Sequence, residues 1–119
     1  TYRLGIGGLH SSEQSAAHQA DANTLLVDRD CSSYYPSIIL RCGFAPAHMG
    51  TAFTRVYQDL VTRRLEAKRS GDKTTADSLK ITINGSFGKF GSRWSKLYSP
   101  DLLIQTTITG QLCLLMLIN

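Results

Sequence analysis

Asp30 follows a short apolar stretch and precedes a turn that is rich in hydroxyl groups. If residues 24–30 form a strand, its period of two places Asp28 and Asp30 on one face. A carboxylate at the end of a buried strand is costly unless it is paired, hydrogen-bonded or bound to a metal, and Mg²⁺ prefers such oxygen ligands. The backbone N–H groups of residues 31–35 could hold an anion beside that metal. The alternative is an aspartate that caps a turn whose two tyrosines simply pack.

A second group of polar side chains lies at helical spacing in the middle of the chain. Arg64 and Lys68 are four residues apart, so both project from one face of a helix. Lys80, Asn84 and Phe87 follow at i, i+4 and i+7, again on one face. A cation, an amide and an aromatic ring on one face can meet a triphosphate and a base together. The alternative is a solvated basic face beside a core phenylalanine.

Two helices must position this second group. Between residues 51 and 70 the apolar side chains recur at the spacing of an amphipathic helix, namely Phe53, Val56, Tyr57, Leu60, Val61 and Leu65. Gly71 is a suitable residue to end this helix, and a second helix is expected from residue 74 or 75 to about Phe87. Because the connection is so short, we expect the two helices to form an antiparallel hairpin.

The other segments predict smaller elements. Residues 2–22 are expected to form a turn-rich lead-in around Gly7 and Gly8, and residues 24–30 a short buried strand. Residues 31–37 are expected to form a turn that contains Pro36, and residues 106–118 a largely buried third helix.

Composition and charge are those of a soluble globular chain with one basic region. The 119 residues are 42% hydrophobic and 18% charged, which is typical of a globular domain rather than of a disordered or fibrous protein. No apolar stretch reaches the roughly 18–20 residues of a membrane span, so no membrane partner is expected. The net charge is +4, and residues 55–96 contain ten basic and four acidic side chains. This region indicates an anionic partner, or else a solvated helix face.

The three cysteines have neither zinc-site nor disulfide spacing. We expect them to be small buried side chains in a reducing cytosol; they are Cys31, Cys42 and Cys113.

Two segments resemble the polymerase motifs of family B DNA polymerases. Residues 30–39, D-C-S-S-Y-Y-P-S-I-I, resemble the first motif, D-x-x-S-L-Y-P-S-I-I. Residues 80–88, K-I-T-I-N-G-S-F-G, are similar to the second motif, K-x-x-x-N-S-x-Y-G. The order and separation fit a short bacteriophage-like member, and residues 89–118 continue the likeness. Gly85, Phe87 and Tyr34 depart from the motif residues, but none of them replaces a metal ligand.

The resemblance implies an α+β fold that is part of a polymerase palm, made of short strands and a packed helix. An antiparallel two-helix fingers hairpin is inserted into it. Residues 1–49 would be the first part of the palm, residues 50–88 the fingers, and residues 89–119 the return to the palm.

The resemblance also implies roles for residues near the first motif. Asp30 would be the catalytic residue and would bind both of two Mg²⁺ ions, with the backbone carbonyl of Cys31 helping to hold one of them. Ser33 and Tyr34 would offer backbone N–H groups to the β- and γ-phosphates. Tyr35 would be a steric gate, whose ring leaves no room for a 2′-hydroxyl group.

For the hairpin, the resemblance implies that the basic side chains bind the triphosphate and that the remaining polar and aromatic ones line the base-pair pocket. The triphosphate ligands would be Arg64, Lys68 and Lys80, and the pocket residues would be Asn84 and Phe87. Contacts to DNA would come from Gly7, Gly8, Gly88 and Lys89.

The implied activity is template-directed transfer of a nucleotide from a dNTP to a primer 3′ end by a two-metal mechanism, in viral DNA replication in the host cytoplasm. The partners would be primer–template DNA, dNTPs and the remainder of the polymerase: its exonuclease, its third motif Y-x-D-T-D and its thumb. The chain is therefore expected to be a fragment that, alone, neither extends a primer nor binds duplex tightly.

Two other functions remain open. Asp28, Arg29 and Asp30 form a D-x-D sequence, a pattern that can hold the metal and nucleotide sugar of a glycosyltransferase. The basic hairpin could instead belong to a non-catalytic nucleic-acid-binding domain, whose DNA affinity would fall steeply with salt and would not depend on Asp30.

Overall fold

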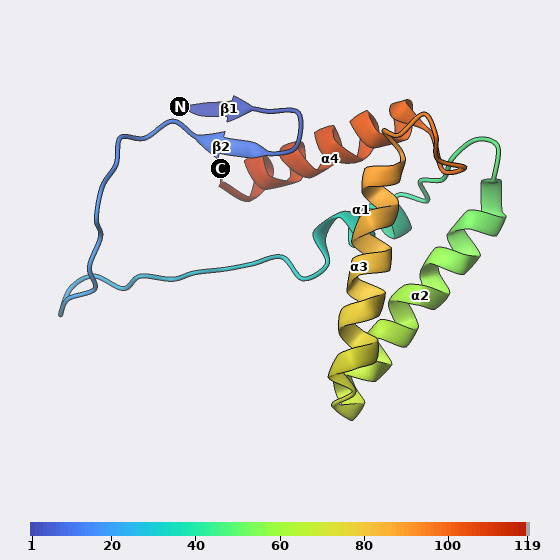
Figure 1. The fold of residues 1–119 in the computed structure, drawn as a ribbon. Coiled ribbons are helices and arrows are strands. Elements are labelled where there is room, and N and C mark those ends of the chain that lie inside the picture. The colour runs from blue at the N-terminus through green and yellow to red at the C-terminus, as the bar shows by residue number, and fades with distance from the viewer. Residues whose placement is uncertain (119) are drawn as a thin grey trace.

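The computed structural model describes residues 1–118 and is mostly helical (Figure 1). A two-stranded antiparallel hairpin precedes four helices. The elements are β1 (Tyr2–Leu4), β2 (Leu9–Ser11), α1 (Tyr34–Arg41), α2 (Gly50–Ser70), α3 (Lys73–Lys89) and α4 (Pro100–Ile118). Of the expected α+β arrangement the structure shows the helical part; the two short strands are its only sheet among the described residues, and they do not form a polymerase palm.

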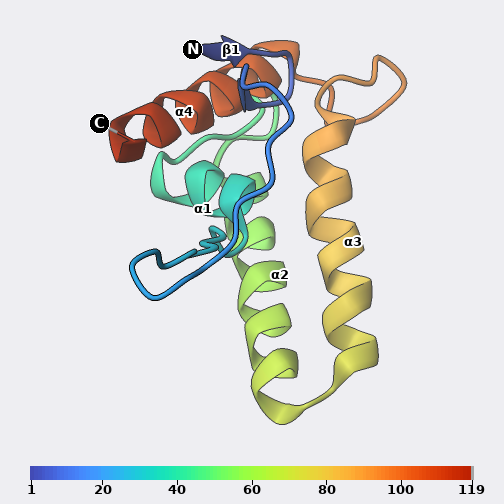
Figure 2. The same cartoon turned by 90° about the vertical axis from the view of Figure 1, so that its left-hand side faces the viewer.

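The helical hairpin expected between residues 51 and 87 is present as α2 and α3, which run antiparallel side by side (Figure 2). Gly71 ends α2 in the left-handed conformation, with φ of 78°, as its lack of a Cβ allows. The Asp72 side chain then accepts a hydrogen bond of 3.0 Å from the Thr75 amide and caps α3. The hydroxyl and amide of Thr75 lower the pKa of the Asp72 carboxyl.

The core lies where the hairpin meets α1 and α4. Its buried side chains are Ile39, Phe53, Tyr57, Ile83, Phe90 and Leu102. Each fully buried side chain of this kind contributes about 1.5–3 kcal/mol relative to an exposed one. The rings of Phe53 and Tyr57 stack at 5.2 Å, and the Tyr57 hydroxyl donates to the Ile83 carbonyl at 3.3 Å. The ring stack lies within α2, whereas the hydrogen bond from Tyr57 to Ile83 joins α2 to α3.

The glycine-rich lead-in forms the β1–β2 hairpin, which lies along α4 (Figure 1). Its turn is closed by a hydrogen bond of 2.8 Å from the Gly5 amide to the Gly8 carbonyl. The buried Gln111 side chain of α4 donates to the Gly5 and Gly8 carbonyls at 2.5 and 3.0 Å. The expected turn around Gly7 and Gly8 is therefore present, and it is anchored from α4.

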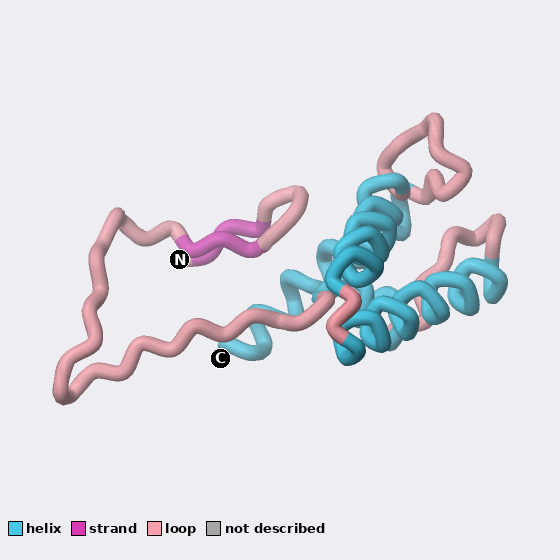
Figure 3. The backbone as a smooth tube through the Cα atoms, turned by 60° about the horizontal axis from the view of Figure 1, so that its bottom comes forward, coloured by secondary structure: helices cyan, strands magenta, loops and turns pink. Residues whose placement is uncertain are grey.

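The predicted buried strand at residues 24–30 is wrong. This segment is extended and exposed, and it belongs to the long connection between β2 and α1 (Figure 3). Leu25 is 83% exposed and Leu26 is 51% exposed. A strand needs a neighbour to satisfy its backbone and bury its apolar face, and neither of the described strands pairs with these residues. The radius of gyration is accordingly 17.2 Å, against about 13.5 Å for a compact chain of this length.

Three further expectations need correction. The turn at residues 31–37 gives way to α1 at Tyr34, because a proline is tolerated in the first helical turn, where Pro36 lies. The third helix begins at Pro100, six residues before the expected start, with proline again in the first turn. All three cysteines are exposed rather than buried.

Helix α4 is also less buried than expected. One face, with Leu102, Thr106 and Gly110, packs against the protein, whereas Met116 and Leu117 near its end are exposed. Only 28% of its most apolar 18-residue window is buried, and by length and composition alone this helix could cross a membrane.

Candidate functional site

A cavity of ≈ 540 Å³ lies where the start of α1 meets the facing sides of α2 and α3. Nine of the side chains singled out from the sequence line it, although they come from segments far apart in the chain. The lining comprises Asp30, Ser32, Ser33, Tyr34, Tyr35, Pro36, Arg64, Lys68, Lys80, Asn84 and Phe87. No role was assigned to Ser32 and Pro36 from the sequence. Their positions next to Ser33 and Tyr35 in the sequence could have indicated that they line the same site.

Arg64 joins the first motif-like segment to α2. Its Nη1 atom donates a hydrogen bond of 2.7 Å to Oγ of Ser33, which lies immediately before α1. Its Nε atom is buried and has no hydrogen-bond partner among residues 1–118. A buried donor without an acceptor costs about 1–3 kcal/mol, so Arg64 can still gain from an anion that enters the cavity.

Ser33 occupies the left-handed region, with φ of 52° and ψ of 51°. Such a conformation costs a non-glycine residue roughly 1–2 kcal/mol. The hydrogen bond from Arg64 and the start of α1, where the Ser37 amide donates to the Ser33 carbonyl at 2.9 Å, hold it there. The strained backbone turns the chain from the extended segment into the helix beside the cavity.

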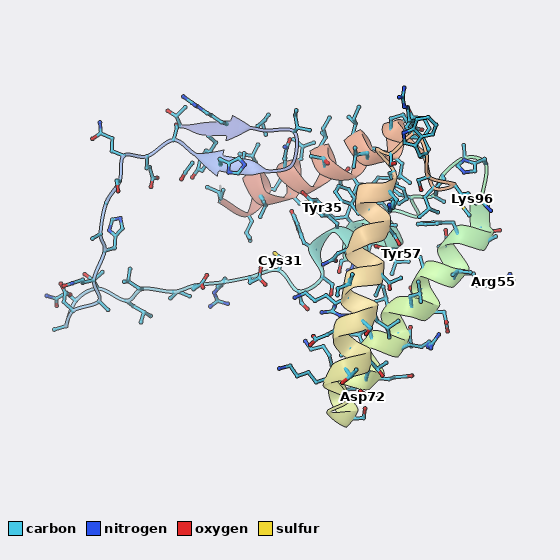
Figure 4. All side chains as sticks on the ribbon, viewed as in Figure 1. Cys31, Tyr35, Arg55, Tyr57, Asp72 and Lys96 are labelled. Atoms are coloured by element: carbon cyan, nitrogen blue, oxygen red, sulfur yellow. The ribbon has the colours of Figure 1, made fainter. Side chains whose placement is uncertain are left out.

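Three aromatic rings also line the cavity, those of Tyr34, Tyr35 and Phe87. The rings of Tyr35 and Phe87 stack with centroids 4.3 Å apart and planes 14° from parallel. The Tyr35 hydroxyl donates to the Gly7 carbonyl, so the ring is held between α3 and the β1–β2 turn (Figure 4). The Tyr34 hydroxyl donates to the Gly110 carbonyl at 2.5 Å, and burial raises the pKa of this phenol.

The cavity is lined by charged side chains of both signs. Its cations are Arg64, Lys68 and Lys80, and its one carboxylate is Asp30. Among the described residues the single ion pair joins Arg63 and Asp59, 3.9 Å apart on the exposed side of α2, so none of the cavity charges is neutralised by a salt bridge. The three cations would attract a polyphosphate. The Asp30 carboxylate would repel it, unless a bound cation lay between the carboxylate and the phosphates.

The donor set fits one Mg²⁺ ion, provided that phosphate oxygens complete its coordination. Mg²⁺ commonly uses one or two carboxylates together with substrate phosphates. Asp30 lines the cavity, whereas Asp28 lies outside it on the extended segment, and no cluster of three acidic, histidine or cysteine side chains occurs in residues 1–118. The expected pair of ions would need more oxygen ligands than these residues bring together.

The other residues predicted from the resemblance do not line this cavity. Cys31 is exposed next to Asp30, and Gly88 and Lys89 are exposed at the end of α3. Gly7 is connected to the cavity only through the Tyr35 hydroxyl, and Gly8 through the same turn.

Comparison with known proteins returns no match. No family model matches the chain, and no curated protein and no solved structure matches it. A functional assignment therefore depends on the two motif-like segments and on the cavity that they share.

Proposed function

We propose that this chain is the nucleotide-binding part of a DNA-directed DNA polymerase of the family B type. One observation carries the proposal: side chains from the two motif-like segments line a single cavity with unpaired cations, a carboxylate and stacked aromatic rings. In this proposal α2 and α3 are the fingers, and α1, α4 and the β1–β2 hairpin belong to the palm.

The cations of the cavity would bind the triphosphate of an incoming nucleotide. Lys68 and Lys80 contribute charge from facing helices, and the unpartnered Nε of Arg64 contributes a directed donor. Asp30 would hold the Mg²⁺ that accompanies the triphosphate; when bound, this ion would neutralise charge that develops on the phosphates.

The aromatic rings of the cavity would position the base and the sugar. Tyr35 is held by the stack on Phe87 and by the Gly7 carbonyl, so its ring has little freedom to move aside for a 2′-hydroxyl group. Asn84 on α3 adds an amide to the same cavity. This arrangement supports a preference for dNTPs over rNTPs.

The remaining partners belong to the same proposal. Primer–template DNA would lie past Gly7, Gly8, Gly88 and Lys89, and further ligands for a second Mg²⁺ would come from the rest of a polymerase with its exonuclease, third motif and thumb. The activity would serve viral DNA replication in the host cytoplasm.

Calorimetric titration of the 119-residue chain with dATP and Mg²⁺ tests the proposal. We expect Asp30→Asn and Lys80→Gln each to weaken dATP binding by about tenfold, because each removes a charged ligand of the Mg²⁺–triphosphate unit. Arg69→Gln, which removes an exposed charge of α2 outside the cavity, should leave the affinity unchanged.

The Asp28→Asn variant distinguishes the proposed function from a D-x-D glycosyltransferase. A D-x-D glycosyltransferase would bind a nucleotide sugar and would need both aspartates, whereas here only Asp30 lines the cavity. A nucleic-acid-binding domain would bind DNA without binding dATP, and with no effect of Asp30→Asn. Unchanged dATP affinity in the Asp30→Asn variant would refute the proposed function.

A further inference from the structure

A second cavity, of ≈ 350 Å³, lies between α2 and α3 nearer the Gly71 turn. Its lining comprises Arg64, Ala67, Lys68, Gly71, Lys73, Ala76, Asp77 and Lys80. Three of these residues, Arg64, Lys68 and Lys80, also line the nucleotide cavity. The two cavities therefore adjoin, with long basic side chains forming the boundary between them.

The second cavity is basic but not aromatic. It has four cations, Lys73 being the one that the first cavity lacks, and a single carboxylate, Asp77. None of these side chains belongs to the one ion pair found in residues 1–118. The first cavity has three aromatic rings and an amide for a nucleoside, whereas the lining of the second offers only charge and small side chains. Its chemistry suits a small anion that carries no base.

The backbone N–H groups at the start of α3 do not by themselves account for this anion site. The Thr75 amide in the first turn is already used by the Asp72 cap, at 3.0 Å. The attraction must therefore come mainly from the lysine and arginine side chains that line the cavity.

We propose that the second cavity receives the inorganic pyrophosphate released from the nucleotide cavity. The inference rests on the proposed function. In that reaction the primer 3′-oxygen forms a bond to the α-phosphorus, the bond from the α-phosphorus to the bridging oxygen breaks, and pyrophosphate leaves with that electron pair while the hydroxyl proton passes to water. Because Arg64, Lys68 and Lys80 border both cavities, pyrophosphate can move toward Lys73 without leaving a positively charged surface.

Titration calorimetry of the 119-residue chain with sodium pyrophosphate, with and without Mg²⁺, tests this proposal. Two substitutions are expected to change the pyrophosphate affinity in opposite directions. Lys73→Gln should weaken pyrophosphate binding by about fivefold, and Asp77→Asn should strengthen it by a similar factor, because one removes a cation and the other an anion. Neither should change dATP affinity, since both residues lie outside the nucleotide cavity.

Two further variants serve as matched controls. Asn84→Ala should weaken dATP binding and leave pyrophosphate binding unchanged, because Asn84 lines only the first of the two cavities. Arg69→Gln removes a positive charge near the same turn without touching either lining and should change neither affinity. Circular dichroism of each variant verifies that the helices remain folded.

The results separate this proposal from the proposed function. Absence of pyrophosphate binding, or equal pyrophosphate affinity in Lys73→Gln and the parent chain, overturns the pyrophosphate site even if dATP binds as expected. If Lys73→Gln weakens binding of a single-stranded oligodeoxynucleotide but not of pyrophosphate, the cavity serves a nucleic-acid strand and the proposal is wrong. If the parent chain binds pyrophosphate but not dATP, the proposed function is wrong, and the second cavity is an anion site that does not receive a reaction product.

Discussion

Ser33 and Arg64 lie 31 residues apart in sequence and meet through one hydrogen bond of 2.7 Å. The motif resemblance implied that both would bind phosphate, Ser33 through its backbone N–H and Arg64 through its charge. The hydrogen bond between them shows that the Arg64 side chain is already oriented before a ligand binds. Preorganisation of this kind lowers the conformational entropy lost on binding.

Tyr57 provides a prediction about pH. Burial raises the pKa of this phenol above its ordinary value of 10.0, so folding favours the neutral form. Its contribution to stability is complete below pH 10.0 and declines as the pH rises toward the folded-state pKa, because the unfolded chain releases the proton first. The Tyr57→Phe variant should lose about 1 kcal/mol at neutral pH with the hydroxyl's hydrogen bond to Ile83.

Urea unfolding of both proteins between about pH 8 and pH 11 measures this effect. The difference in stability between parent and variant should shrink toward the alkaline end. A difference that stays constant across the range would show that Tyr57 ionises as readily in the folded chain as in the unfolded one.

At the scale of elements, the α2–α3 hairpin was predictable because helix hydrogen bonds and capping are local. The apolar spacing located α2 and Gly71 located its end. Helix α3 begins at Lys73 rather than at the expected residue 74 or 75, because Asp72 is the cap. The segment at residues 24–30 has an equally clear local pattern, but a strand depends on a neighbour that the sequence pattern does not specify.

Helix α3 offers a matched pair of substitutions. Ile83 is 2% exposed and packs in the core, whereas Ile81, two residues earlier, is 74% exposed. Ile83→Ala should destabilise the chain by about 2–4 kcal/mol through lost burial and a cavity. Ile81→Ala should change stability by less than about 0.5 kcal/mol, since alanine is also a good helix former.

Chemical denaturation with a helical circular dichroism signal measures both variants. Equal destabilisation by the two substitutions would mean that α3 presents a different face to α2 than the one described.

At the scale of the whole molecule, the β1–β2 hairpin and α4 are joined by Gln111, 106 residues from Gly5 in sequence. Gln111→Leu keeps the volume of the side chain similar but removes its donor to the Gly5 and Gly8 carbonyls. Amide exchange of residues 2–11 should increase, by roughly tenfold for each 1.4 kcal/mol of local stability lost. Exchange in α2 and α3 should remain as in the parent.

Gln105→Leu is the control, because Gln105 is exposed on the same helix. Hydrogen exchange read by mass spectrometry or NMR distinguishes the two variants. Unaltered protection of residues 2–11 in the Gln111→Leu variant would mean that the turn is held by Tyr35 and backbone contacts alone.

By itself, the sequence determined the hairpin and the chemical character of the candidate site. Both depend on short-range order: hydrogen bonds between residues four apart, a cap, a left-handed glycine, and charged side chains one turn apart on a helix face. Only the tertiary structure decided that Asp30 and Tyr35 share a cavity with Arg64 and Phe87, that residues 24–30 lie exposed, and that α4 is buried along one face. Burial and long-range contacts require a partner elsewhere in the chain, and a local pattern carries no information about where that partner lies.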